Sequence, residues 1–183
     1  MPRLAVFGSS HVNQLQTHLK TYPGRFLEGH THMFIGRDEM RVDHKFEEAF
    51  AQLRKFRPDA VFVILGGNDI GGTTSPADLA YALMNVRSRM LELGAKVVLF
   101  GSVERRLKTC GVTPHAYDKV RRKVNKKLRK FLKKCYVDLN KKWKFPRQYA
   151  SDGVHPSTGP KGGCASLLRL VRSCLDWAAV NFC

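Results

Sequence analysis

The feature that most constrains the fold is a run of six apolar residues, Ala60 to Leu65, rich in β-branched and aromatic side chains. A strand without polar residues at alternate positions is buried on both faces, which is typical of parallel sheets. Residues 3–7 and 96–103 predict two further strands, and residues 25–28 and 135–139 predict two shorter ones. The chain therefore predicts a mostly parallel sheet whose connections cover both of its faces.

Helical patterns separate the predicted strands. Residues 11–22 and 46–56 carry apolar side chains at helical spacing, and a last helix is expected over residues 163–177. Ser75-Pro76 and Thr113-Pro114 each place an N-cap residue before a proline suited to the first helical position. This alternation predicts a single domain over residues 1–183. Its fold class is α/β, three-layer α/β/α, with a flavodoxin-like, mostly parallel five-stranded sheet.

Composition narrows the class of protein. Hydrophobic residues make up 43% of the chain, which is ordinary for a globular domain. No apolar stretch approaches the roughly 20 residues that a membrane span needs, and the run after Arg3 is too short for a signal peptide. The five cysteines are odd in number and widely spaced, which favours free thiols in a reducing compartment, with one disulfide as the alternative. We therefore expect an intracellular protein, cytoplasmic or nuclear.

A turn at the end of the first predicted strand carries the first candidate for chemistry. The sequence Gly8-Ser9-Ser10-His11 follows a buried strand and runs directly into a helix. Backbone N–H groups at a helix N-terminus have no partner inside the helix, and the helix dipole favours negative charge there. Ser10 is thus placed as a nucleophile whose reaction generates an oxyanion, with a plain N-cap as the alternative. The side chain of His11 diverges from that of Ser10 by about 100°, so we do not expect His11 to be the base.

Two later segments supply partners for such a serine. Asn68 follows the strand that ends at Leu65, and Asp152 and His155 lie three residues apart before the last helix. Sites in open sheets form at the carboxyl ends of the strands, so these segments can meet at one edge. Acyl transfer needs a hydroxyl nucleophile, a base, a carboxylate that orients the base, and donors for the oxyanion. Asp152 and His155 can supply the carboxylate and the base, while Asn68 and the backbone N–H groups of Ser10 and Gly36 can supply the donors.

The three segments resemble the sequence blocks of the SGNH hydrolases, also called GDSL-type esterases. Gly8-Ser9-Ser10 is similar to that family's Gly-Asp-Ser block, Gly66-Gly67-Asn68-Asp69 matches Gly-x-Asn-Asp, and Asp152-Gly153-Val154-His155 matches Asp-x-x-His. The resemblance spans the whole predicted domain and implies the SGNH hydrolase fold. It also implies the site residues, namely Ser10 as nucleophile, His155 as base, Asp152 as its orienting carboxylate, and Ser10 and Asn68 as oxyanion donors.

Two further points concern these blocks. Gly36 is similar to the glycine of the family's remaining block, which supplies a donor N–H. Ser9 stands where the family has aspartate, so the local support of Ser10 carries no charge.

We expect no cofactor and no metal, because His30, His32 and His44 have no cysteine or carboxylate set at ligand spacing. The expected substrate is a small ester with a short acyl or acetyl group, since the predicted loops are short and include no lid.

A basic segment supplies most of the charge of the chain. The formal net charge is +17, and residues 119–147 hold fourteen Lys or Arg against one acid, Asp138. Like charges four residues apart repel within a helix, so such a segment indicates a polyanionic partner, RNA or DNA, with a merely solvated helix face as the alternative. No sequence-reading module is evident, so binding should be non-specific and depend steeply on salt. The candidate phosphate contacts are Arg121, Arg122, Lys126, Lys127, Arg129, Lys130, Lys133 and Lys134.

Two hypotheses of function therefore stand side by side. The first is a serine esterase that works through an acyl-enzyme intermediate. The second is a weakly active or inactive domain of the same fold that binds nucleic acid through residues 119–147, and the replacement of aspartate by Ser9 supports it. A basic domain of this kind also resembles the esterase-type domains of some metazoan retroelements, whose proteins bind nucleic acid.

An apolar stripe of Tyr117, Val120, Val124, Leu128 and Phe131 is expected to face the core, which leaves the charge in solvent.

Overall fold

The computed structural model describes residues 1–24 and 26–183. Its centre is a five-stranded parallel sheet in the order β2-β1-β3-β4-β5. The strands are β1 (Arg3–Gly8), β2 (Thr31–Gly36), β3 (Ala60–Ile64), β4 (Val97–Gly101) and the two-residue β5 (Tyr136–Val137). The α/β fold class and the parallel five-stranded sheet predicted from sequence are confirmed.

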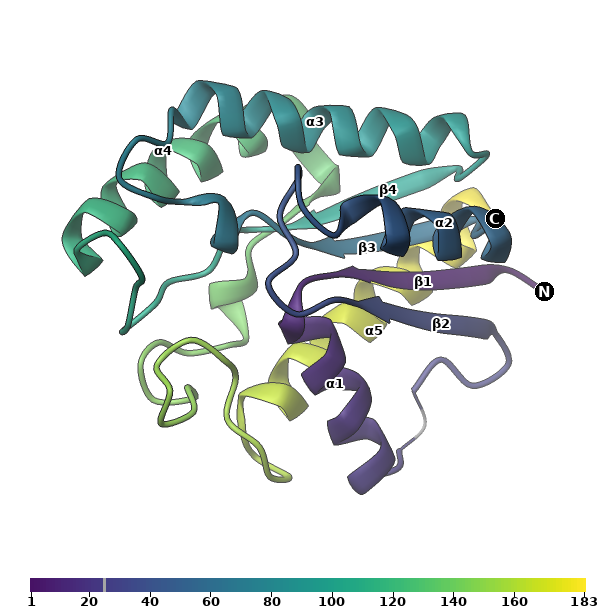
Figure 1. The fold of residues 1–183 in the computed structure, drawn as a ribbon. Coiled ribbons are helices and arrows are strands. Elements are labelled where there is room, and N and C mark those ends of the chain that lie inside the picture. The colour runs from purple at the N-terminus through teal and green to yellow at the C-terminus, as the bar shows by residue number, and fades with distance from the viewer. Residues whose placement is uncertain (25) are drawn as a thin grey trace.

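Five helices cover the two faces of the sheet (Figure 1). Helices α1 (Ser10–Thr21) and α5 (Gly163–Phe182) pack on one face, and α2 (Phe46–Phe56), α3 (Pro76–Glu92) and α4 (Pro114–Leu132) lie on the other. Short 3₁₀ turns follow three of the strands or helices: η1 (Gly67–Asp69), η2 (Lys133–Cys135) and η3 (Leu139–Lys141). Both predicted N-caps are confirmed, since Ser75 and Thr113 accept hydrogen bonds from the backbone N–H groups of Asp78 and Ala116.

The first strand reaches the site through a glycine. A Cβ atom at Gly8 would lie 1.9 Å from the carbonyl oxygen of Ile64, so only glycine lets the end of β1 approach the end of β3 this closely. The N–H of Ser9 then donates to that carbonyl at 3.1 Å. In the strand order 2-1-3-4-5, β1 and β3 flank the point where the chain switches direction across the sheet, which is where ligands bind in such folds. Ser10 begins α1 at this point.

Two sequence-based expectations are corrected by the structure. The second strand is not at residues 25–28 but at Thr31–Gly36, where an edge position explains the exposed first half of its sequence. Arg25 itself lies outside the described residues. The buried stripe of α4 does not end on Phe131, whose side chain is 55% exposed, but on Leu132. The buried side chains of α4 recur at intervals of three or four residues, and in the structure this series includes Arg121 and ends at Leu132.

Candidate active site

Asp152 and His155 form a tight turn in which one carboxylate fixes one imidazole. Asp152 Oδ1 accepts hydrogen bonds from the backbone N–H groups of Val154 at 2.8 Å and His155 at 3.0 Å, while Oδ2 lies 2.7 Å from His155 Nδ1. Gly153 provides the left-handed conformation, with φ of 69°, that lets the chain fold back on the carboxylate. Burial raises the pKa of Asp152, but the hydrogen bonds from His155 and Val154 outweigh it and lower that pKa to about 2. The carboxylate is therefore charged at neutral pH.

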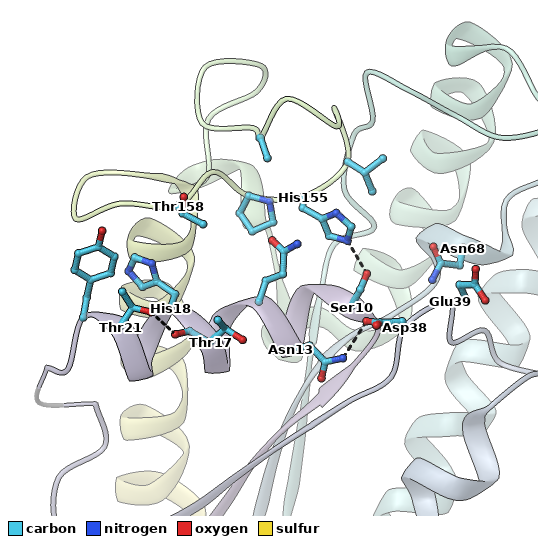
Figure 2. Close-up of a pocket in the computed structure, with 15 residues that line it drawn as sticks. Ser10, Asn13, Thr17, His18, Thr21, Asp38, Glu39, Asn68, His155 and Thr158 are labelled. Carbon is cyan, nitrogen blue, oxygen red and sulfur yellow. Dashed lines mark hydrogen bonds between the residues drawn. The ribbon is translucent and has the colours of Figure 1, made fainter.

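The other nitrogen of the same imidazole reaches the serine. Ser10 Oγ lies 2.7 Å from His155 Nε2, and Figure 2 shows the two side chains facing each other across the groove. With Asp152 charged, Nδ1–H donates to the carboxylate and Nε2 accepts from the hydroxyl. A hydroxyl that contacts an imidazole, which in turn contacts a carboxylate, is the arrangement that activates a serine for attack on a carbonyl.

Asn68 lies beside this pair, as the second residue of η1. Its side chain lines the same groove as Ser10 and His155. Arg106 Nη2 donates to Asn68 Oδ1 at 2.8 Å, and Asn68 Nδ2 donates to the carbonyl oxygen of Met40 at 3.1 Å. An amide nitrogen has two N–H groups, so one is left beside the groove. Asn68 can therefore donate a hydrogen bond to an oxygen held near Ser10.

Gly36 differs from the other two predicted oxyanion donors, Ser10 and Asn68, because a side chain lies over it. A Cβ atom at Gly36 would lie 2.2 Å from Asn13 Oδ1, so the side chain of Asn13 covers this glycine. Asn13 in turn donates to Asp38 at 3.0 Å and lines the groove in its place. Gly36 is not among the described residues that form the groove wall. Its role as an oxyanion donor stays a prediction.

The side chain of His11 is fully buried. In the described structure its hydrogen bonds go to Ser9 and Val154, and neither involves Ser10 Oγ. Its Nε2 lies 3.2 Å from the carbonyl oxygen of Val154, so this nitrogen carries the proton, and burial lowers the pKa of the ring so that it is neutral. Nδ1 then accepts from the hydroxyl of Ser9 at 3.2 Å. Ser9, at the position where the sequence blocks have aspartate, thus satisfies a neutral histidine.

The groove runs from Ser10 along the exposed side of α1. Its volume is about 820 Å³, and its walls are α1 on one side and the loop of residues 150–158 on the other. Asn13, Thr17, His18 and Thr21 follow the helix, as Figure 2 shows. The groove is partly open to solvent, and Ser10 and His155 are among the residues that line it.

The sequence profile of the GDSL-like lipase/acylhydrolase family matches residues 7–159. The chain belongs to this family. It is accordingly a serine hydrolase of the carboxylic ester class, and the resemblance to SGNH hydrolases seen in the sequence blocks is confirmed. A search of curated proteins gave no match.

Solved structures share the fold of this GDSL-family chain at low sequence identity. A GDSL-like lipase from Bacteroides thetaiotaomicron superposes with a TM-score of 0.73 at 15% identity, over 97% of this chain and 89% of that one. The esterase EstA from a Pseudoalteromonas species gives 0.70 at 10% identity, over 99% and 100% of the two chains. An acetylxylan esterase from Geobacillus stearothermophilus gives 0.66 at 15% identity, over 92% and 91%. The whole chain therefore has the architecture of these enzymes.

The candidate phosphate contacts of this GDSL-family chain do not all reach solvent. Arg121 is 5% exposed, since its guanidinium donates to Asp118 at 2.8 Å and to the carbonyl oxygen of Val103 at 3.4 Å. The prediction of a phosphate contact at Arg121 is therefore wrong, because this side chain lies on the buried stripe of α4 and bonds to the segment that follows β4. The remaining seven are exposed: Arg122, Lys126, Lys127, Arg129, Lys130, Lys133 and Lys134.

The described residues of this GDSL-family chain form neither a metal-binding group nor a membrane-spanning helix. In residues 1–24 and 26–183, no three His, Cys, Asp or Glu side chains are grouped so as to hold a metal ion. No helix in the same ranges combines the length and the apolar character needed to cross a membrane. Over these residues all five cysteines are free thiols.

Proposed function

We propose that this protein hydrolyses esters of short acyl groups, of the acetyl type, with Ser10 as nucleophile, His155 as base and Asp152 as the carboxylate that orients the base. The observation that carries the proposal is the pair of 2.7 Å contacts on the two nitrogens of one imidazole, to Ser10 Oγ and to Asp152 Oδ2. Such a pair of contacts activates the hydroxyl and fixes the tautomer of the base together.

The reaction follows from these contacts. His155 Nε2 takes the hydroxyl proton while Ser10 Oγ forms a bond to the ester carbonyl carbon, and the carbonyl electrons move to its oxygen. Donors at the N-terminus of α1, with the amide N–H of Asn68, stabilise that oxyanion. The imidazolium then gives its proton to the departing alkoxide, which leaves an acyl group on Ser10. Water, deprotonated by His155 in the same way, attacks the carbonyl carbon of this acyl-enzyme. The bond between that carbon and Ser10 Oγ then breaks as the imidazolium returns its proton to Oγ, which releases the carboxylic acid and restores the serine.

Initial rates with p-nitrophenyl esters of increasing chain length test this proposal. We expect turnover of the acetate, with kcat/KM falling from acetate to octanoate because the groove formed by the described residues is partly open to solvent and not closed around an acyl chain. Ser10→Ala should lose at least about 10³-fold in kcat. Ser151→Ala is the matched control, since Ser151 is an exposed serine on the neighbouring loop. An active Ser10→Ala variant, or an inactive wild type, would overturn the proposal, and a preference for octanoate would remove its short-chain part.

A second candidate function, which leaves the esterase site free, is non-specific binding of nucleic acid to the α4 basic surface. We define this surface as the exposed Lys and Arg side chains of α4 and η2, namely Lys119, Arg122, Lys123, Lys126, Lys127, Arg129, Lys130, Lys133 and Lys134. The observation that favours it is the shortage of acids. In the described part of the chain, Asp118 pairs with Arg121 and Arg122, and Asp138 pairs with Arg129, whereas the lysines of the surface make no ion pair.

The shape of the surface suits a phosphate backbone. Helix α4 has 19 residues and is therefore about 28 Å long. Its lysines follow the helix on the side opposite the buried stripe, so their charges lie along a straight ridge. Phosphates of a nucleic acid can release counterions on contact with such a ridge without any base being read.

A salt titration with fluorescent single-stranded RNA and duplex DNA tests this second function. Wild type should bind both at low salt, with log Kd rising linearly with log salt concentration. Replacement of Lys126, Lys127 and Lys130 by glutamate should reduce that slope by about 2 to 3. The matched control replaces Lys20, Lys55 and Lys161, three exposed lysines elsewhere, with the same change in net charge. No binding at low salt, or equal losses in the two triple variants, would overturn this function.

A further inference from the structure

The amide of Asn68 is held on its oxygen by a charged side chain outside the proposed triad. Arg106 Nη2 donates to Asn68 Oδ1 at 2.8 Å. A guanidinium has only donors, so the opposite amide orientation would place the NH2 group of Asn68 against another donor. The bond therefore selects one of the two amide orientations. In that orientation the nitrogen is the atom that contacts Met40 and faces the groove side.

Glu104 keeps the guanidinium of Arg106 in this position. Glu104 Oε1 lies 3.5 Å from Arg106 Nη2, and the two side chains are only 4% and 12% exposed. Burial raises the pKa of Glu104, but the nearby His11 Nε2, 3.6 Å from Oε1, together with the charge of Arg106 and the hydrogen bonds of Glu104, outweighs burial and brings that pKa below its usual range. A buried guanidinium without a carboxylate partner is costly, so Glu104 makes the charge beside Asn68 tolerable.

The backbone before Asn68 is shaped around this pair. A Cβ atom at Gly67 would lie 2.4 Å from Glu104 Oε1 and 2.6 Å from Arg106 Nη2. The pair is therefore packed directly against the residue that precedes Asn68. Tyr117 holds the segment from the far side, since its hydroxyl donates to the carbonyl oxygen of Glu104 at 3.2 Å and its ring lies 5.5 Å from the guanidinium carbon of Arg106.

We propose that Arg106 is a positioning residue for ester hydrolysis and that Glu104 anchors it. The inference rests on the esterase function proposed above. Arg106 acts through Asn68 in two ways. It turns the amide nitrogen toward the oxygen that becomes negatively charged, and it draws electron density from the amide oxygen, which makes the remaining N–H a stronger donor to that oxyanion. Because the negative charge on this oxygen develops in the transition state and is absent from the bound ester, the effect falls on kcat.

Steady-state kinetics with p-nitrophenyl acetate provide the first test. Arg106→Met should lower kcat by about 10- to 100-fold and leave KM within about twofold, because one donor is misplaced rather than removed. Arg106→Lys, which keeps a donor near Asn68, should recover part of the loss. Arg105→Met is the matched control, since Arg105 is the adjacent arginine and is exposed. A kcat for Arg106→Met equal to that of wild type or of the control would overturn the inference.

A double-mutant cycle separates positioning from a purely structural effect. In an Asn68→Ala background, Arg106→Met should cost less than about twofold, because the group through which it acts is gone. An equal loss in both backgrounds would overturn the inference, as that result indicates a general structural role. Thermal melting checks folding, and if Arg106→Met does not fold, Glu104→Gln, which removes only the anchoring charge, carries the same prediction. A wild type without turnover at Ser10 would defeat the proposed function itself, whereas an active wild type with an uncoupled Arg106 defeats only this inference.

Discussion

Asp152 uses both carboxylate oxygens on a single turn. Oδ1 accepts from two backbone N–H groups and Oδ2 from the ring of His155, so the turn and the imidazole are fixed by the same side chain. The pKa of Asp152 is lowered to about 2, and its charge therefore stabilises the fold above about pH 4. That contribution disappears as the pH falls from about 4 toward 2.

Asp152→Asn should lower kcat for p-nitrophenyl acetate by about 10²- to 10⁴-fold with a smaller change in KM. An amide can still accept from the backbone but no longer stabilises the imidazolium or selects the tautomer with Nδ1 protonated. Steady-state rates at pH 7.5 measure this effect. Asp176→Asn is the control, because Asp176 is an aspartate on α5 whose only ion pair in the described structure is with Arg172. Activity within threefold of wild type would contradict a role for Asp152 in orienting the base.

Ser9→Ala should reduce the free energy of unfolding by about 1–3 kcal/mol, because it leaves buried Nδ1 of His11 without a partner. Urea denaturation at pH 7.5 measures the change. Ser151→Ala, on an exposed loop, should stay within about 0.5 kcal/mol of wild type. If Ser9→Ala proved as stable as Ser151→Ala, the hydrogen bond between Ser9 and His11 would have no energetic importance.

At this scale the sequence predicts the residues that lie within recognisable sequence blocks. Such blocks contain Ser10, Asn68, Asp152 and His155, and each block follows a predicted strand or precedes a predicted helix. Arg106 could not be selected, since its contact with Asn68 joins residues 38 positions apart and has no local pattern. The only sequence signal for such residues was the presence of charged residues directly after a predicted buried strand.

At the scale of elements, hydrophobic pattern predicted the buried strands and the capped helices well. All five residues of β3 are buried, as its unbroken apolar sequence indicated. The edge strand β2 was misplaced because Thr31, His32 and Met33 are exposed and give no alternating pattern. The stripe of α4 was misread by one position at its end because Phe131 is as apolar as Leu132, and only the packed structure distinguishes them.

The turn η1 also carries a carboxyl group that supports a loop. Asp69 Oδ1 accepts from the backbone N–H of Val42 at 2.9 Å, while Oδ2 is buried without a hydrogen-bond partner among the described residues. Burial raises the pKa of Asp69 to about 6. The native state therefore holds this proton between about pH 4 and pH 6, where the unfolded chain has released it. Stability from this group is present at low pH and falls as the pH rises through that window.

Asp69→Asn should remove this dependence on pH. The difference in free energy of unfolding, variant minus wild type, should increase by up to about 3 kcal/mol between pH 4 and pH 7, since one pKa unit corresponds to about 1.4 kcal/mol. Urea titrations of both proteins at several pH values provide the measurement. Asp78→Asn, on exposed α3 sequence, serves as control. A difference that stays constant with pH would show that Asp69 is not a buried acid.

At the scale of the whole molecule, the order of the strands brings the distant segments together. Ser10 follows β1 and Asn68 follows β3, its neighbour in the sheet, while His155 comes from the loop before α5, which packs beside α1. The charge is arranged separately, since the α4 basic surface belongs to a helix that packs on the opposite face of the sheet from α1. The sequence shows that residues 119–147 are rich in Lys and Arg, but only the folded structure shows that Arg121 is buried.

Covalent labelling with a fluorophosphonate, followed by peptide mapping, tests most directly whether Ser10 and His155 work as one unit. We expect a single phosphonylated residue, Ser10, in wild type. We also expect a labelling rate at least about 100-fold lower in His155→Ala and unchanged in His115→Ala, which alters an exposed histidine on α4. No label on wild type, a label on another residue, or equal labelling rates in wild type and His155→Ala would contradict this prediction.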